Sequence, residues 1–338
     1  MEQDPLQQIN QTPPPDHRLM HAAMLTLAGL ILAGVGFMSA YGLAGAWYGT
    51  GEAPTSQTAA AVEASATTTD PFASVSLIAK SAYVLDLQTG QVLYQQNPNA
   101  QLPLASLTKI ALMLVVSDAL PGDSIITIPP HQTPDGAPVR IPAGSSWHVQ
   151  DLIDFTLVPS SNEGAVLLAQ AANREVAAAY PDAPQNGSDS ATLWRMNNLA
   201  SQLGLSNTYF LNVSGLDLSN TQSGAYGSAH DVAELFAHAE KTHPDVFAAT
   251  THSTIERTTI DGTTLTAQNT DIALNAIPDI IMGKTGYTDL AGGNLGVVFD
   301  AAPNHPVVAV VIGSTEDGRF TDMRQLIPAI QEAISQGK

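Results

Sequence analysis

Hydrophobic and polar residues follow two periods along this chain, and the order of these periods predicts the fold. Before residue 105 and after about residue 279, short apolar runs bounded by Gly, Asn and Pro indicate strands. Between these regions, longer runs with helical periodicity indicate helices. The predicted strands are 81–86, 91–94, 279–288, 295–300 and 307–313. The predicted helices include one that begins at Ser106 and others over 165–172, 193–203, 229–241 and 322–335.

This order of elements is typical of an α+β fold. The first two strands flank Gln88-Thr-Gly90 and should form a hairpin. We expect these two strands and the three late ones to form one antiparallel five-stranded sheet packed on terminal helices. The segment from 105 to about 240 should form a mostly helical insertion beside that sheet.

The N-terminal region has the composition of a membrane segment. No charged residue occurs from Ala22 to Gly51, which exceeds the ~20 apolar residues that span a bilayer. Arg18 precedes this stretch and no basic residue follows until Lys80, so the positive-inside rule places the N-terminus in the cytoplasm. A cleaved signal peptide is the alternative, because Ala44-Gly-Ala46 resembles a processing site.

We therefore divide the chain into four parts and expect a single-pass protein of the cell membrane. Residues 49–74 are rich in Ala, Thr and Ser and should form a flexible linker, because they cannot bury a core. The parts are a short cytoplasmic tail (1–18), a transmembrane signal-anchor helix (19–48), the linker (49–74) and an extracytoplasmic catalytic domain (75–338).

The composition argues against several classes of function. A net charge of -19 with only twelve Lys and Arg residues argues against nucleic acid as a partner. The chain has no cysteine, which excludes disulfides and thiol catalysis. Its nine histidines lack the spacing of metal ligands, so we expect no metal site and no cofactor. Gly292-Gly-Asn-Leu-Gly296 does not fit a nucleotide-binding fingerprint and is interpreted as a turn entering a strand.

Candidate chemistry begins with Ser106-Leu-Thr-Lys109, which opens an apolar run that continues to Leu120 and stops at Pro121-Gly122. The serine should lie at a helix N-terminus, where free N–H groups favour the negative charge of a tetrahedral intermediate. Residues i and i+3 share a helix face, so Lys109 can reach the Ser106 hydroxyl. Taken alone, the motif is explained more simply as a capping serine and a surface lysine.

Two later motifs change that balance. Ser160-Ser-Asn162 lies in a predicted turn between two helices, although turn chemistry alone would explain it. Lys284-Thr-Gly286 lies on a predicted strand, where a glycine often marks close approach by a ligand. The chain has only five lysines, and two of them belong to these motifs. The order S-x-x-K, S-x-N, K-T-G indicates a serine acyl-transfer site.

With these motifs, residues 78–328 resemble the low-molecular-mass penicillin-binding proteins, specifically the serine D-alanyl-D-alanine carboxypeptidases. Further similarity lies in Phe210–Asp217, in Ser228–Asp231 and in Gly283–Thr288. The resemblance implies a β-lactamase/transpeptidase-like fold and a peptidoglycan stem peptide ending in D-Ala-D-Ala as substrate. One departure is Asn269-Thr-Asp271, which replaces the Asn-rich turn usual in the family.

The resemblance also implies a role for each catalytic residue. Ser106 attacks the carbonyl of the penultimate D-Ala, and a neutral Lys109 takes its proton. Ser160 passes a proton to the departing D-Ala amine, while Asn162 orients Lys109 and the substrate amide. β-Lactams mimic the D-Ala-D-Ala end and should acylate Ser106 as inhibitors.

The third motif supplies the residues that the resemblance assigns to substrate binding. Lys284 and Thr285 would hold the terminal carboxylate of the substrate. Gly286 and Tyr287 continue the same strand. The oxyanion would lie between the backbone N–H groups of Ser106 and Tyr287.

Three alternatives compete with this interpretation. A class A β-lactamase carries S-D-N where this chain has Ser160-Ser-Asn162. It also needs a dedicated glutamate, and this chain has no glutamate in a matching segment, because none occurs between Glu175 and Glu234. A membrane-tethered sensor would need a cytoplasmic output module, which 18 residues cannot form. A DD-endopeptidase of the same superfamily, which cuts cross-links instead of trimming ends, stays open.

Overall fold

The computed structural model describes residues 69–130 and 141–337. The predicted cytoplasmic tail, the anchor and most of the linker lie outside the described residues. Within the described part of the chain, no helix is both long enough and apolar enough to cross a membrane.

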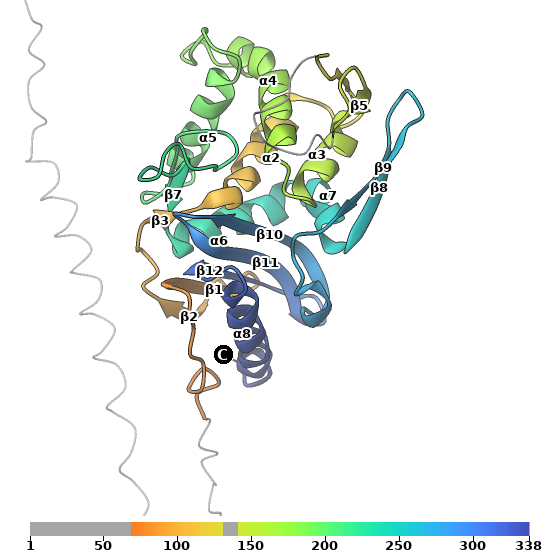
Figure 1. Cartoon of the computed structure of the whole chain (residues 1–338). Coiled ribbons are helices and arrows are strands. Elements are labelled where there is room, and N and C mark those ends of the chain that lie inside the picture. Colours follow the sequence, from red (N-terminus) through yellow and green to blue (C-terminus); the bar gives the residue numbers. More distant parts are fainter. Residues whose placement is uncertain (1–68, 131–140, 338) are drawn as a thin grey trace, which may run out of the picture. The chain divides into compact units, whose positions relative to one another are not determined.

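A five-stranded antiparallel sheet lies below most of the helices in the view of Figure 1. Its strand order, β10-β11-β12-β1-β2, places the N-terminal hairpin beside the three late strands. The strands are β1 (Ser81–Asp86), β2 (Val92–Gln96), β10 (Ile280–Thr288), β11 (Gly292–Ala302) and β12 (His305–Ser314). The predicted α+β fold with this sheet is confirmed.

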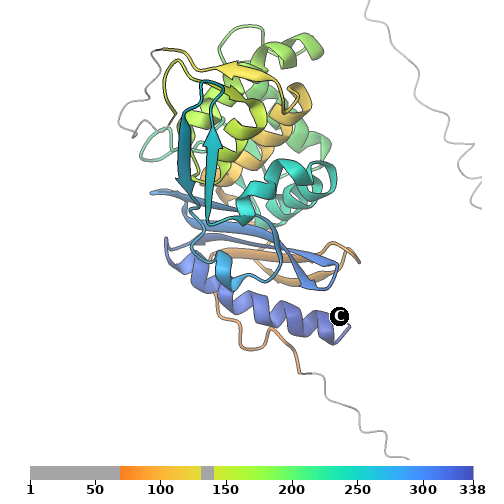
Figure 2. The same ribbon diagram turned by 90° about the vertical axis from the view of Figure 1, so that its right-hand side faces the viewer.

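The sheet is buried on both faces, which explains the continuous apolar runs of its central strands. Alternate side chains of a strand point to opposite faces. Val307, Ala309 and Val311 of β12 therefore pack in the core that includes side chains of α8 (Gly318–Ser335). Their neighbours in β12 pack in the larger core on the opposite face, which includes α6 (Ala229–Thr242). Figure 2 shows α8 on one side of the sheet and the helical block on the other.

The helical block is built around one buried helix, α2 (Thr108–Ala119), which is buried from Thr108 to Val116. This helix packs against α4, α5 and α6, and the short turn that precedes it packs against β10 and β11. The remaining helices are α3 (Val149–Leu157), α4 (Asn162–Ala179), α5 (Ser190–Gln202) and α7 (Pro244–Phe247), with the short 3-10 turns η1 (Ala105–Leu107), η2 (Ala248–Thr251) and η3 (Leu274–Ala276).

Short strands accompany the block. One pair, β8 (Thr254–Thr258) and β9 (Thr264–Gln268), forms a separate hairpin that the sequence analysis did not predict. Figure 1 shows this hairpin projecting beside α3 and α7. The others are β3 (Leu102–Pro103), β4 (Ile125–Thr127), β5 (Ser146–His148), β6 (Tyr209–Phe210) and β7 (Ala225–Gly227).

Two local predictions were wrong. The helix expected over 165–172 begins earlier, because Ser161 accepts a hydrogen bond from Gly164 N at 3.0 Å and caps the first turn. Asn162 is therefore the first residue of α4 and does not lie in the turn. Gly292–Gly296 is not a turn entering a strand, because all five residues belong to β11.

Candidate active site

Ser106 lies in η1, immediately before α2. The preceding residue, Ala105, has a φ of +48°, an uncommon conformation for a residue with a Cβ, and such strain clusters at functional sites. Gly215 packs closely against this turn. Its own φ is +82°, and a Cβ at this position would stand 1.9 Å from the Ala105 carbonyl oxygen. The prediction of a serine at a helix N-terminus is confirmed, and the serine itself is part of a strained turn.

Lys109 is completely buried beside that serine. Its Nζ lies 2.8 Å from Ser106 Oγ, 2.7 Å from Asn162 Oδ1 and 2.9 Å from the carbonyl oxygen of Ser214. Burial, and secondarily the charge of Lys284, holds the pKa of Lys109 well below 10.5.

A neutral amine has two N–H groups and one lone pair, and the three contacts of Lys109 fit this inventory. The amide oxygen of Asn162 and the carbonyl oxygen of Ser214 can only accept hydrogen bonds. The two N–H groups therefore point to these oxygens, and the lone pair is left for the Ser106 hydroxyl. This arrangement is that of a general base aimed at a nucleophile.

The turn between α3 and α4 carries the second motif. Ser160 has a φ of +58°, and its Oγ accepts a hydrogen bond of 2.8 Å from Lys284 Nζ. Asn162, two residues further on and the first residue of α4, contacts Lys109 instead. The motif therefore joins the two lysines of the site.

Lys284 lies on β10 with 2% of its surface exposed. Besides Ser160, its Nζ donates to the carbonyl oxygen of Thr285 at 2.9 Å. The pKa of Lys284 is lowered to about 7, mainly by burial and then by the charge of Arg319, while Asp271 opposes the shift. An ammonium group has three donors, and the described residues supply two acceptors, so one donor remains for an anionic ligand.

The rest of the third motif brings β10 against the nucleophile. Gly286 allows this approach, since a Cβ there would lie 2.9 Å from the Leu104 carbonyl oxygen and 3.2 Å from Ser106 N. Thr285 Oγ1 lies 2.6 Å from Thr270 Oγ1, so the segment that departs from the family pattern does contact the site. Tyr287, the next residue of β10 after Gly286, is 45% exposed.

Sequence reasoning missed residues that support the site from outside the motifs. Asn294, fully buried on β11, donates at 3.0 Å to the carbonyl oxygens of Pro103 and Leu104 and so ties the sheet to the Ser106 turn. Arg319 donates to the Gly286 carbonyl oxygen at 2.8 Å. The sequence did offer one signal for Asn294, because it is an amide residue next to the apolar run of a predicted strand.

Hydrogen bonds connect the residues that the sequence analysis named for the site, except Gly286 and Tyr287, which follow Thr285 on β10. Ser106, Lys109 and Asn162 form one hydrogen-bonded group, and Ser160, Lys284 and Thr285 form a second. Within residues 69–130 and 141–337, no cluster of three or more His, Asp or Glu side chains could hold a metal ion.

Comparison with known proteins agrees with this arrangement. Residues 64–316 match the family model described as D-alanyl-D-alanine carboxypeptidase. The chain is 32% identical over 252 residues to a D-alanyl-D-alanine endopeptidase of Pseudomonas aeruginosa, covering 72% of this chain and 74% of the relative. It is 30% identical over 247 residues to the D-alanyl-D-alanine carboxypeptidase DacF of Bacillus subtilis, covering 70% of this chain and 58% of the relative.

A solved structure shares the fold. Penicillin-binding protein D2 from Listeria monocytogenes, in its cefotaxime-bound form, superimposes with a TM-score of 0.62 at 26% sequence identity. The superposition covers 76% of this chain and 98% of the Listeria chain.

Proposed function

The chain belongs to the D-alanyl-D-alanine carboxypeptidase family, and we propose that it removes the terminal D-Ala of peptidoglycan stem peptides through an acyl-enzyme on Ser106. The observation that carries this proposal is the contact of the buried Lys109 with the Ser106 hydroxyl at 2.8 Å. Burial holds the pKa of Lys109 well below 10.5, and a lowered pKa favours the neutral amine, which is the form that can accept the Ser106 proton.

In the first step, Ser106 Oγ attacks the carbonyl carbon of the penultimate D-Ala while its proton passes to Lys109 Nζ. The C–O bond of the ester forms, and the carbonyl oxygen becomes an oxyanion. We place this oxyanion between the backbone N–H groups of Ser106 and Tyr287, at the N-terminal end of the buried α2.

The second step breaks the C–N bond. Ser160, whose Oγ lies 2.8 Å from Lys284 Nζ, passes its proton to the leaving amine and regains a proton from Lys109, which is then neutral again. Lys284 supplies its remaining N–H donor to the carboxylate of the departing D-Ala, and the Thr285 hydroxyl is the second partner of that carboxylate. Water then attacks the ester, with Lys109 as base, and releases the shortened peptide and free Ser106.

The same geometry supports acylation of Ser106 by β-lactams. A β-lactam presents a strained amide and a nearby carboxylate, which fit the nucleophile and Lys284. The Listeria protein of this fold is described with cefotaxime bound. We therefore propose that β-lactams inhibit this enzyme by forming a Ser106 ester.

We also propose that residues 19–48 anchor the enzyme in the cell membrane, with residues 1–18 in the cytoplasm and the catalytic domain outside. The support is the uncharged stretch from Ala22 to Gly51. The full chain should remain in the membrane pellet after an alkaline wash. A mature N-terminus near Trp47 in mass spectrometry would instead show a cleaved signal peptide.

The catalytic proposal is tested by release of D-Ala from a pentapeptide that ends in D-Ala-D-Ala. Ser106→Ala should abolish this release because it removes the hydroxyl that Lys109 contacts. Ser335→Ala is the matched control, since Ser335 also precedes a lysine by three residues but lies at the exposed end of α8. Retained release in Ser106→Ala would reject the assignment.

A further inference from the structure

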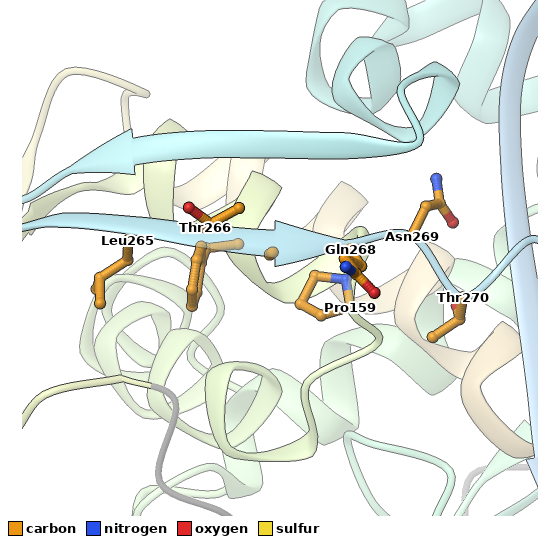
Figure 3. A pocket seen from close by; sticks show the side chains of 8 residues that line it. Pro159, Leu265, Thr266, Gln268, Asn269 and Thr270 are labelled. Carbon is orange, nitrogen blue, oxygen red and sulfur yellow. The ribbon is translucent and has the colours of Figure 1, made fainter.

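Two cavities in the described part of the chain differ in their chemistry. The larger, of about 600 Å³, lies along β9 and includes Pro159, the residue before Ser160, in its lining (Figure 3). Its lining has no charged side chain, and it adjoins the active site. The smaller, of about 260 Å³, is lined by charged side chains and by residues of α2, α4 and α5. We call this smaller one the helix cavity.

The helix cavity lies away from the catalytic groups. Its lining on α2 consists of Val115, Asp118 and Ala119, in the C-terminal half of that helix, whereas Ser106 lies just before the N-terminal end. A helix rises 1.5 Å per residue, so Asp118 stands about 15 Å along the axis from Thr108. A molecule in this cavity would therefore not contact the nucleophile.

The cavity contains a buried positive charge, Arg195 of α5, which has 8% of its surface exposed. Its Nη1 donates to Asn198 Oδ1 at 3.2 Å and to Gln202 Oε1 at 2.9 Å. Its guanidinium carbon lies 5.0 Å from the centre of the Tyr180 ring. These contacts orient the guanidinium group, but none of them supplies a negative charge. Because arginine is almost never buried without a charged partner, the pairing of Arg195 decides what the cavity can bind.

The ion pair of Arg195 with Asp118 is incomplete. Asp118 Oδ2 lies 4.0 Å from Arg195 Nη2, which is too long for a hydrogen bond. The Asp118 side chain is 48% exposed, and its Oδ1 lies 3.3 Å from His243 Nε2. Within the described residues, Arg195 Nη2 and Nε therefore donate no hydrogen bond. The donors of a buried guanidinium remain for an anionic group.

A second carboxylate, that of Glu175 on α4, also lines the cavity. Its Oε1 accepts hydrogen bonds of 3.0 Å and 2.8 Å from the exposed Arg174, and its Oε2 accepts none within the described part of the chain. The lining thus combines one buried guanidinium with two carboxylates. A simple anion would be repelled by Asp118 and Glu175, and a simple cation would be repelled by Arg195. A molecule that carries both charges avoids either repulsion.

The remaining lining limits the size of such a molecule. Val115, Ala119, Val176 and Ala179 supply short apolar side chains. The volume of about 260 Å³ lies below the roughly 300–1,000 Å³ of pockets that bind drug-sized ligands. The cavity therefore fits a small molecule with a short apolar substituent.

We infer that the helix cavity binds a small zwitterionic α-amino acid. Its carboxylate accepts hydrogen bonds from Arg195, and its ammonium group lies at Asp118 and Glu175. Its side chain packs on the small apolar residues of the lining. D-Alanine belongs to this chemical class and is the probe. The inference does not rest on the proposed function, because no residue of the catalytic mechanism lines the cavity.

The test is equilibrium dialysis of the full chain with radiolabelled D-alanine. Propionate, which lacks the amine, and ethylamine, which lacks the carboxylate, are the competitors. Asp118→Asn and Arg195→Gln each remove one charge of the helix cavity, and the exposure of Asp118 makes the first variant safe for folding. Asp182→Asn is the matched control, because Asp182 is an exposed acid outside the lining. Lys284→Met removes the cation that would hold D-alanine at the active site.

We expect saturable binding of D-alanine to the wild type and to Lys284→Met. Asp118→Asn and Arg195→Gln should each raise the Kd roughly ten- to hundredfold, the effect of one lost charged hydrogen bond, and Asp182→Asn should change it less than about twofold. Both competitors should displace D-alanine at least about tenfold less well than unlabelled D-alanine does.

Three results would overturn the inference. They are no saturable binding below about 10 mM D-alanine, binding that Asp118→Asn leaves unchanged, and binding that only Lys284→Met abolishes. Propionate that competes as well as D-alanine would contradict the zwitterionic class. Release of D-Ala from the pentapeptide is measured separately, so its absence would reject the proposed function and leave this inference standing.

Discussion

The two buried lysines should give the enzyme a bell-shaped pH profile whose basic side is set by Lys284. Lys109 must be neutral to accept a proton, so kcat/KM rises with pH as Lys109 loses its proton. Lys284 must be charged to hold the substrate carboxylate, so kcat/KM falls as pH rises through the Lys284 pKa of about 7. Burial is the main cause of that low value, and Arg319 and Asp271 act on it in opposite directions.

Substitution of these two neighbours should therefore move the basic limb in opposite directions. The displacement of the Lys284 pKa from 10.5 to about 7 corresponds to roughly 5 kcal/mol at ~1.36 kcal/mol per unit. Unit charges about 10 Å apart contribute roughly 1.7 kcal/mol at an effective dielectric of about 20, or about one pH unit. Asp271→Asn removes a charge that raises the pKa, so the limb should move to lower pH by about half a unit to one unit. Arg319→Met should move it to higher pH by a similar amount.

The assay is kcat/KM for D-Ala release between about pH 5 and pH 10, which reports the pKa values of the free enzyme. Arg319→Lys is the control because it keeps the charge while it changes the hydrogen bond to the Gly286 carbonyl oxygen. Its basic limb should stay where the wild-type limb lies. A limb that stays fixed in both charge-changing variants, or moves the same way in both, would refute the electrostatic reasoning.

The remaining predictions concern the groups that hold the Ser106 turn. Gly215→Ala should destabilise the protein by well over the ~1–2 kcal/mol that a left-handed conformation costs an alanine, because its Cβ would meet the Ala105 carbonyl oxygen at 1.9 Å. Gly204→Ala is the control, because Gly204 has a φ of +73° and a Cβ there would meet nothing within 4 Å, so this variant measures the conformational cost alone. Both variants are compared by urea unfolding, and equal losses of unfolding free energy would contradict the role of Gly215. Asn294→Ala should lower the free energy of unfolding by about 2–4 kcal/mol, because it removes the hydrogen bonds to the Pro103 and Leu104 carbonyl oxygens and the acceptor of the buried Gly313 N–H. A loss below about 1 kcal/mol in the same assay would show that Asn294 does not tie the sheet to the turn.

Much of the fold could be predicted because the sheet is buried on both faces. The run 307–312 is apolar at every position, so it stands out between Pro306 and Gly313. The β8–β9 hairpin was missed because its strands are rich in threonine and largely exposed, and therefore carry little hydrophobic pattern. Asp261-Gly262, a dipeptide common in hairpin turns, was the signal that would have found it.

The site could be predicted where side chains carry the chemistry and could not where the backbone does. The three motifs name their residues directly. Ser214 supports Lys109 through its carbonyl oxygen, and this contact does not depend on the identity of its side chain. Asn294 and Arg319 act through partners far away in the sequence, so a single sequence gives no indication of what they contact.

The most direct test of the central claim follows the full chain with a fluorescent penicillin over time and locates the adduct by peptide mass spectrometry. We predict a long-lived ester on Ser106 that is absent from Ser106→Ala and present in Ser335→Ala. An adduct on another residue, or no adduct in the folded wild-type protein, would contradict the assignment of Ser106 as the nucleophile.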